Sequence, residues 1–350
     1  MNKSQLSALR LPAIVVAGVV LAVILTVALS AQQQTPFQLT QRYAAPKVPA
    51  TQTVYRLVPL FRTADDVHQR ALQLGLSAAT VGKLQPRGAT YRTADAKWTY
   101  IMDTKRQFET LFDTPTLKGA GGRSFLVPPD NKCRELALEY LGTHNIAQGT
   151  DDEKLVYERT NELVSSFHAV ADGNKPSPPP IVTMREVVFA KTINGVPTTG
   201  QGTHVSVYVG DKGKIIGHVS NWMPALPTPE RVEVAPGGEG FGLLRDRLVE
   251  RDRLAPTAQR RVSAVTVEAS RYALVISADQ QGQLLAVPGY QFRGQVTDRS
   301  RRTGSFTESV AAPRSAAVRA RLTPLEEVAP EPKPQLRGAI RVPRILPLPR

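Results

Sequence analysis

Histidine is the side chain most often used for metal binding and acid–base catalysis near neutral pH, and the chain contains five. They stand at His68, His144, His168, His204 and His218. No two are four residues apart, as the ligands of a helical zinc site would be, and the sequence contains no His-Glu-x-x-His. His204 and His218 are expected on two strands of one hairpin and could approach each other, but no further ligand is evident. We therefore expect no metal site.

Other chemical motifs are also missing from the sequence. No Gly-x-Ser-x-Gly occurs, so the nucleophile turn of an α/β-hydrolase is not indicated. The glycines of 236–242 (PGGEGFG) miss the Gly-x-Gly-x-x-Gly spacing of a dinucleotide loop and indicate a flexible entry to a helix. The acidic residues at 65–66 and 151–153 fit the first turns of helices, where the dipole favours them. We expect no catalytic residue and no cofactor.

Charge and cysteine content narrow the class of protein. The chain has 350 residues and a net charge of +14, of which residues 298–350 carry +6 (11 basic minus 5 acidic). The remaining +8 is spread over 297 residues, and aromatic residues make up only 6%. A nucleic-acid-binding domain usually concentrates basic residues on one surface, so we expect no nucleic-acid partner. The single cysteine, Cys133, excludes an intrachain disulfide.

The N-terminal region contains one long apolar run. Residues 11–32 carry no charge over 22 positions, which is long enough for a transmembrane helix. Lys3 and Arg10 precede the run, so the positive-inside rule places residues 1–10 in the cytoplasm and the rest outside it. Cleavage before Ala31, as in a signal peptide, is the alternative and would make the protein secreted. The expectation is a single-pass membrane protein with its bulk extracytoplasmic.

A first α+β unit is expected at 53–127, after a Pro-containing stalk at 33–52. Thr63 and Asp66 outline a capping box, and Val67, Ala71 and Leu74 then fall on one helical face. A strand at 53–58 precedes this helix. Short antiparallel strands are predicted after it at 89–93, 97–103 and 106–113.

A second unit, 128–234, combines a helix with a hairpin. The helix is predicted from Asp130 to Leu141, and Cys133 lies on its apolar stripe, so Cys133 is expected in the core. Valines alternate with polar residues at 203–210, and a turn at 210–213 leads to a strand at 214–223. Two further strands are expected before this hairpin, at 161–171 and 182–194.

A third unit is predicted at 235–297, with a helix around 243–249 and strands at 262–277 and 284–296. The expected fold class is therefore α+β, with one helix packed on antiparallel strands in each repeated unit. Residues 298–350 are rich in arginine and proline and lose periodicity, which predicts a disordered tail.

Two segments together resemble a known family. One is Ile193-Asn194-Gly195-Val196-Pro197 followed by THVSVYVGDKGKIIGHVSNW, and the other is QLLAVPGYQFRG at 283–294. They resemble PepSY-like exported domains, including multi-unit membrane-anchored regulators of envelope sensing, over about 53–297. The resemblance implies binding or inhibition of a protease or a sensor protein, without catalytic residues. No peptidase domain is attached, so a propeptide role is not supported.

The sequence as a whole favours a membrane-anchored, extracytoplasmic, non-enzymatic protein that binds and modulates a protein partner in the cell envelope. The residues expected to contact this partner lie on the family-like hairpin: Trp222, Tyr208, His204 and His218. One alternative is an envelope hydrolase acting on peptidoglycan or polysaccharide, which would need converging carboxylates in a cleft. Another is a scaffold whose basic tail contacts anionic lipid or wall polymer.

Overall fold

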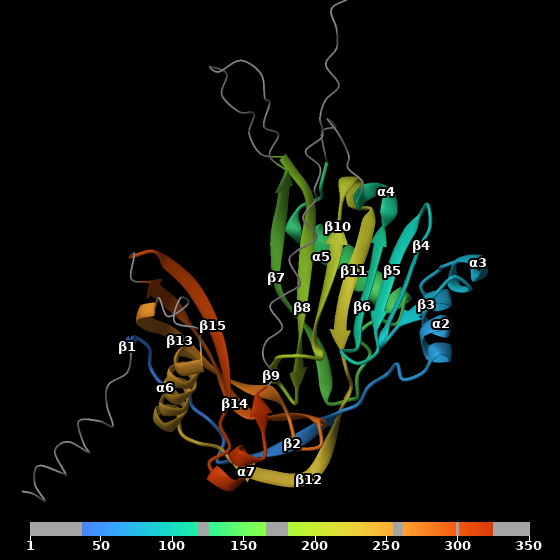
Figure 1. Ribbon diagram of the computed structural model, residues 1–350. Coiled ribbons are helices and arrows are strands. Elements are labelled where there is room, and N and C mark those ends of the chain that lie inside the picture. The colour runs from blue at the N-terminus through green and yellow to red at the C-terminus, as the bar shows by residue number, and fades with distance from the viewer. Residues whose placement is uncertain (1–36, 118–125, 166–180, 255–261, 299–300, 325–350) are drawn as a thin grey trace, which may run out of the picture. The chain divides into compact units, whose positions relative to one another are not determined.

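The computed structural model describes residues 37–117, 126–165, 181–254, 262–298 and 301–324 (Figure 1). Contacts divide the chain into two compact units. Unit 1 comprises the described parts of Met1–Ala44, Leu244–Ala269 and Phe292–Thr307. Unit 2 comprises those of Ala45–Leu243, Ser270–Gln291 and Glu308–Arg350 and holds most of the contacts.

A long antiparallel run of strands forms the larger part of unit 2 (Figure 1). In spatial order the run consists of β7 (Glu153–Ser165), β8 (Ile181–Ile193), β10 (Thr203–Val209), β11 (Ile215–Trp222), β6 (Phe108–Asp113), β5 (Trp98–Asp103), β4 (Thr90–Ala94) and β3 (Gln85–Arg87). Val205, Val207 and Val209 of β10 are fully buried on one face of this sheet, as their alternation predicts. The hairpin between β10 and β11 turns through η1 (Asp211–Gly213), where Lys212 and Gly213 have φ values of 53° and 80°.

Helices cover the face to which these valines point. They are α2 (Ala64–Gln73), α3 (Ala78–Val81) and α5 (Asp130–Thr143), and α4 (Thr114–Leu117) follows β6. The predicted capping box is confirmed, because the Thr63 hydroxyl accepts from Asp66 N and the Asp66 carboxylate accepts from Thr63 N. Cys133 is fully buried in the same core, as its helical stripe predicts.

The rest of unit 2 is also built from strands. β2 (Thr51–Leu57) pairs antiparallel with both β12 (Ala225–Glu233) and β14 (Leu284–Asp298). The short β9 (Val196–Thr199) pairs with β8 and, in parallel, with β13 (Val262–Ala278), so it joins the two parts of the sheet. Towards the C-terminus α7 (Ala316–Ala320) is followed by β16 (Thr323–Pro324), which pairs with the end of β13.

Unit 1 combines the remaining parts of β13 and β14 with β1 (Gln38–Gln41), much of α6 (Gly237–Leu254) and the start of β15 (Thr303–Ala311). β1 runs parallel to β13 at residues 264–267. Leu244, Val267 and Phe292 are fully buried here. Gly294 lies so close to the carbonyl of Thr266 that a Cβ would be 2.0 Å from that oxygen, so only glycine fits.

The predicted fold class is wrong in its central feature. Strands assigned to separate repeated units pair with one another: β6 with β11, and β2 with both β12 and β14. These pairings merge the expected helix-on-strand units into a strand-dominated, mixed sheet. The glycines expected as a flexible helix entry instead form the first turns of α6, which begins at Gly237.

The predictions at the two ends of the chain also need correction. The tail predicted to be disordered from 298 contains β15, α7 and β16. In β15, apolar residues such as Phe306 and Val310 fall on one face and support a strand within the arginine-rich sequence. Residues 325–350 lie outside the described residues. So does the segment 11–32, and no helix in the described part is long and apolar enough to cross a membrane. Single-pass anchoring and the localisation inferred from it therefore find no support in the described residues.

A substitution at Gly217 of β11 tests how closely the strands of the sheet pack. A Cβ at this position would lie 2.0 Å from the carbonyl oxygen of Leu111, in the paired strand β6. We expect Gly217→Ala to lower the free energy of unfolding by about 1–3 kcal/mol, because the strands must separate to admit the methyl group. Urea unfolding measures the change. Gly142→Ala is the control, since a Cβ there meets nothing within 4 Å, and an equal loss in both variants would contradict the prediction.

Candidate functional site

The four residues predicted to contact a partner do not form one surface. Trp222 and His218 point to the helix-covered face, whereas Tyr208 and His204 point to the opposite face. Trp222, Tyr208 and His218 are 3%, 7% and 0% exposed. Only His204 has substantial exposure, 39% for its side chain, and its Nε2 lies 3.7 Å from a carboxylate oxygen of Glu158. Their role as contacts stays a prediction, and burial limits any direct contact to His204.

His218 belongs instead to a buried network centred on Glu109. The Glu109 carboxylate accepts hydrogen bonds from Arg70 Nε and Nη2, both at 2.9 Å, and lies 3.2 Å from His218 Nε2. The other imidazole nitrogen of His218 lies 2.9 Å from the Tyr140 hydroxyl, and the Tyr100 hydroxyl donates to Glu109 at 3.3 Å. The network therefore connects α2, α5, β5, β6 and β11.

The electrostatics of this network favour a charged carboxylate. Burial alone would raise the pKa of Glu109, but the hydrogen bond with His218 and the charge of Arg70 outweigh it and bring that pKa to about 2. Burial raises the pKa of the Tyr140 hydroxyl well above its usual range. Because Glu109 is 2% exposed and His218 0%, neither is open to a substrate. The network serves as a structural link between the helices and the sheet.

Trp222 lies beside a second buried ion pair, formed by Lys191 and Glu153. Lys191 Nζ lies 2.5 Å from Glu153 Oε1 and 4.3 Å from the centroid of the Trp222 ring, and it also donates to the carbonyl of Met223. Both charged side chains are essentially inaccessible, 1% and 0% exposed. Burial lowers the pKa of Lys191 and the Glu153 carboxylate opposes that shift. Glu153 thus opens a strand and holds a buried cation, and the expectation that the acids at 151–153 start a helix is wrong.

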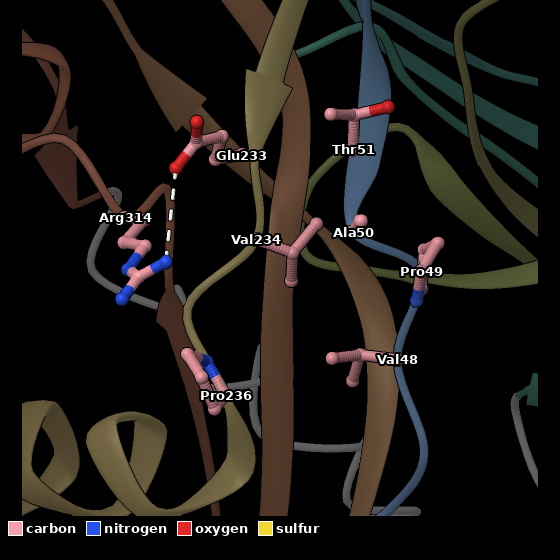
Figure 2. Close-up of a pocket in the computed structure, with 8 residues that line it drawn as sticks. All are labelled: Val48, Pro49, Ala50, Thr51, Glu233, Val234, Pro236 and Arg314. Carbon is pink, nitrogen blue, oxygen red and sulfur yellow. Dashed lines mark ion pairs between the residues drawn. The ribbon is translucent and has the colours of Figure 1, made fainter.

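A cavity of about 470 Å³ lies elsewhere in unit 2 (Figure 2). Its lining consists of Val48, Pro49, Ala50, Thr51, Glu233, Val234, Pro236 and Arg314. Most of these side chains are apolar, and the two charged ones, Glu233 and Arg314, lie 3.9 Å apart and are more than half exposed. Such a lining offers shape but no pair of carboxylates for acid–base catalysis.

The edge of the sheet at β7 is open and exposes apolar side chains. β7 pairs with β8 on one side, and no described strand pairs with its other side. Three apolar residues of β7 are well exposed: Val156 (45%), Tyr157 (37%) and Val164 (55%). An edge strand presents unpaired N–H and C=O groups to an incoming strand. The sequence does not reveal this edge, because its pattern predicts a strand only at 161–171 and places the preceding acids at the start of a helix.

Metal ligands do not converge in the described part of the chain. No group of three or more histidine, cysteine, aspartate or glutamate side chains is placed to hold an ion there. His168, one of the five histidines, lies outside the described residues. His68, His144, His204 and His218 lie on or beside α2, α5, β10 and β11, respectively.

Comparison with known proteins gives no assignment. No family model matches the chain, and no curated protein matches its sequence. Among solved structures, an uncharacterized protein from Eubacterium rectale ATCC 33656 is similar, with 8% identity and a TM-score of 0.48. The match covers 83% of this chain and 90% of that one. The PepSY-like resemblance accordingly stays a prediction.

Removal of the Glu109 charge should strongly destabilise the protein. We expect Glu109→Gln to lower the free energy of unfolding at pH 7 by about 3–5 kcal/mol, because Arg70 would remain buried without its counter-ion. Chemical denaturation measures the loss. Glu135→Gln is the matched control, since Glu135 and its partner Lys132 are both more than half exposed, and that change should cost less than about 1 kcal/mol. Similar losses in the two variants would contradict a structural role for Glu109.

The same carboxylate predicts a dependence of stability on pH. The pKa of Glu109 is about 2 in the folded protein, against about 4.5 for an ordinary glutamate, so its ionised form stabilises the fold above pH 4.5. This contribution, of the order of 3 kcal/mol, should disappear as the pH falls from about 4.5 to 2. Unfolding curves recorded across that range should show a smaller loss in Glu109→Gln than in the wild type. Parallel curves for the two proteins would rule the prediction out.

Proposed function

We propose that the chain is a non-enzymatic binding protein whose sheet receives an extended segment of another polypeptide along β7, and that it modulates this partner. The observation that supports the proposal is the open edge of a 13-residue strand with three exposed apolar side chains. The PepSY-like resemblance, which implies binding to a protease or a sensor protein, agrees with it. The buried Glu109 and Lys191 networks are structural and do not point to catalysis.

Strand addition gives affinity through the main chain and specificity through alternate side chains. Proteins generally shield sheet edges that have no such use, by keeping the edge strand short or by placing proline in it. The opposite edge of the same sheet follows this rule, because β3 has three residues and includes Pro86. β7 is more than four times as long and contains no proline. The contrast between the two edges favours a binding role for β7.

Two irregularities define where a partner strand can pair. The register of β7 with β8 shifts between Tyr157 and Arg159 and again between Leu163 and Val164. Bulges of this kind twist a strand and interrupt pairing along it. The regular stretch from Arg159 to Leu163 lies between them and is where an added strand would pair most evenly.

Proline substitutions at neighbouring positions of this stretch test the proposal. Amide groups alternate along a strand, so one of Thr160→Pro and Asn161→Pro removes a donor from the open edge and the other removes one from the ladder with β8. We expect the variant that keeps wild-type thermal stability to lose partner binding. In-cell photo-crosslinking from an unnatural residue at Val156 or Val164 measures binding, with the same residue at the exposed Leu60 as control.

The outcomes are distinct. A partner crosslinked from both β7 positions, absent from the Leu60 control and lost in the stable proline variant, supports strand addition. The same products from Leu60, or products that persist in the stable proline variant, would reject β7 as the binding edge.

A further inference from the structure

We propose that the segment received by β7 is acidic on one face, with two carboxylates four residues apart, and apolar on the other face. This inference rests on the proposed function and adds the chemistry of the partner. It follows from the sidedness of β7, whose two faces carry different side chains next to the open edge.

One face of β7 is basic at the edge. Lys154 and Arg159 pair with Thr192 and Val188 of β8, which are four residues apart, so both cations project from the same face of the sheet. This is the face opposite the helices, because Phe189, the neighbour of Val188, lies in the helix-covered core. Lys154 is exposed, and the Arg159 side chain is 53% exposed.

The other face of β7 presents an aromatic ring at the edge. Tyr157 pairs with Phe189, and the two rings lie 6.3 Å apart in an edge-to-face arrangement. The guanidinium of Arg134, on α5, stands 5.4 Å above the Tyr157 ring. Leu138 lies one turn further along α5 on the same side and is 44% exposed. Side chains on this face of an added strand would therefore meet Tyr157.

The acidic residues of β7 are already engaged by cations of the same unit. Glu153 binds Lys191, Glu162 lies 2.7 Å from Arg185, and Glu158 contacts both Arg159 and His204. In contrast, no carboxylate of the described chain lies within ion-pair distance of Lys154. Lys154 and Arg159 thus outnumber Glu158, the carboxylate beside them. The surplus positive charge favours a partner strand that brings carboxylates of its own, because opposite charges facing each other across strands are stabilising.

Selection from a random peptide library displayed on phage tests the composition of the segment. The full-length protein is the target, and eight-residue inserts are long enough to span β7 from Lys154 past Arg159. We expect the enriched peptides to carry two Asp or Glu residues four positions apart, facing Lys154 and Arg159, with apolar residues on the other face. A synthetic copy of the most enriched peptide then allows its Kd to be measured by fluorescence anisotropy.

Charge reversal at the edge provides the decisive comparison. The double variant Lys154→Glu with Arg159→Glu should bind the acidic peptide roughly tenfold more weakly, since two favourable cross-strand pairs become repulsive. A peptide with lysine in place of each acid should show the opposite preference. The matched control reverses the exposed Arg92 and Lys105, which lie on β4 and after β5, and so changes the net charge equally without touching β7.

The possible results distinguish a failure of this inference from a failure of the proposed function. Acidic peptides that need Lys154 and Arg159 and tolerate the control reversal support the inference. Enriched peptides that are not acidic, yet are lost in the stable proline variant, overturn it and leave the proposed function intact. If no enriched peptide depends on the open edge, both proposals fail. A dimer seen by analytical ultracentrifugation and lost in that same variant would make a second copy the occupant and would also overturn the inference.

Discussion

The attraction between Arg70 and Glu109 is the interaction on which the helix-covered sheet of unit 2 depends. Burying one charge costs several kcal/mol, and this pair is stable in the core because each of the two side chains makes several hydrogen bonds. Arg70 also donates to the carbonyl of His144 at the end of α5, while Glu109 reaches His218 on β11. Two helices and two strands are thereby fixed relative to one another by a single charged centre. The apolar core around it then packs in one arrangement.

A fixed sheet has consequences for its edges. The Lys191–Glu153 pair connects the first residue of β7 to β8 and to the residues that follow β11. The edge strand is therefore anchored at its first residue. Binding by strand addition costs less conformational entropy when the receiving strand is already ordered. The buried charges are therefore connected to the proposed function through rigidity, although they are too deeply enclosed to contact a partner.

Local features of the fold could be predicted from the sequence, and long-range ones could not. The capping box at Thr63, the helix that buries Cys133 and the hairpin of β10 and β11 follow from spacing within a few residues. The pairing of β2 with β14 joins residues more than 200 positions apart, and no local pattern specifies it. The charged network was hidden for the same reason, because Arg70, Glu109 and His218 come together only after the sheet has formed. The open edge was missed because its acidic start resembled a helix N-terminus.

The position of Trp222 affects the intrinsic fluorescence of the protein. The chain has two tryptophans, and their surroundings differ: Trp222 is buried beneath the ammonium of Lys191, whereas Trp98 is only partly buried beside Lys97. A fixed charge next to an indole changes the energy of its excited state, so the emission of Trp222 carries a signature of the buried ion pair. The protein therefore contains an intrinsic chromophore that reports on the anchoring of β7 without any added label.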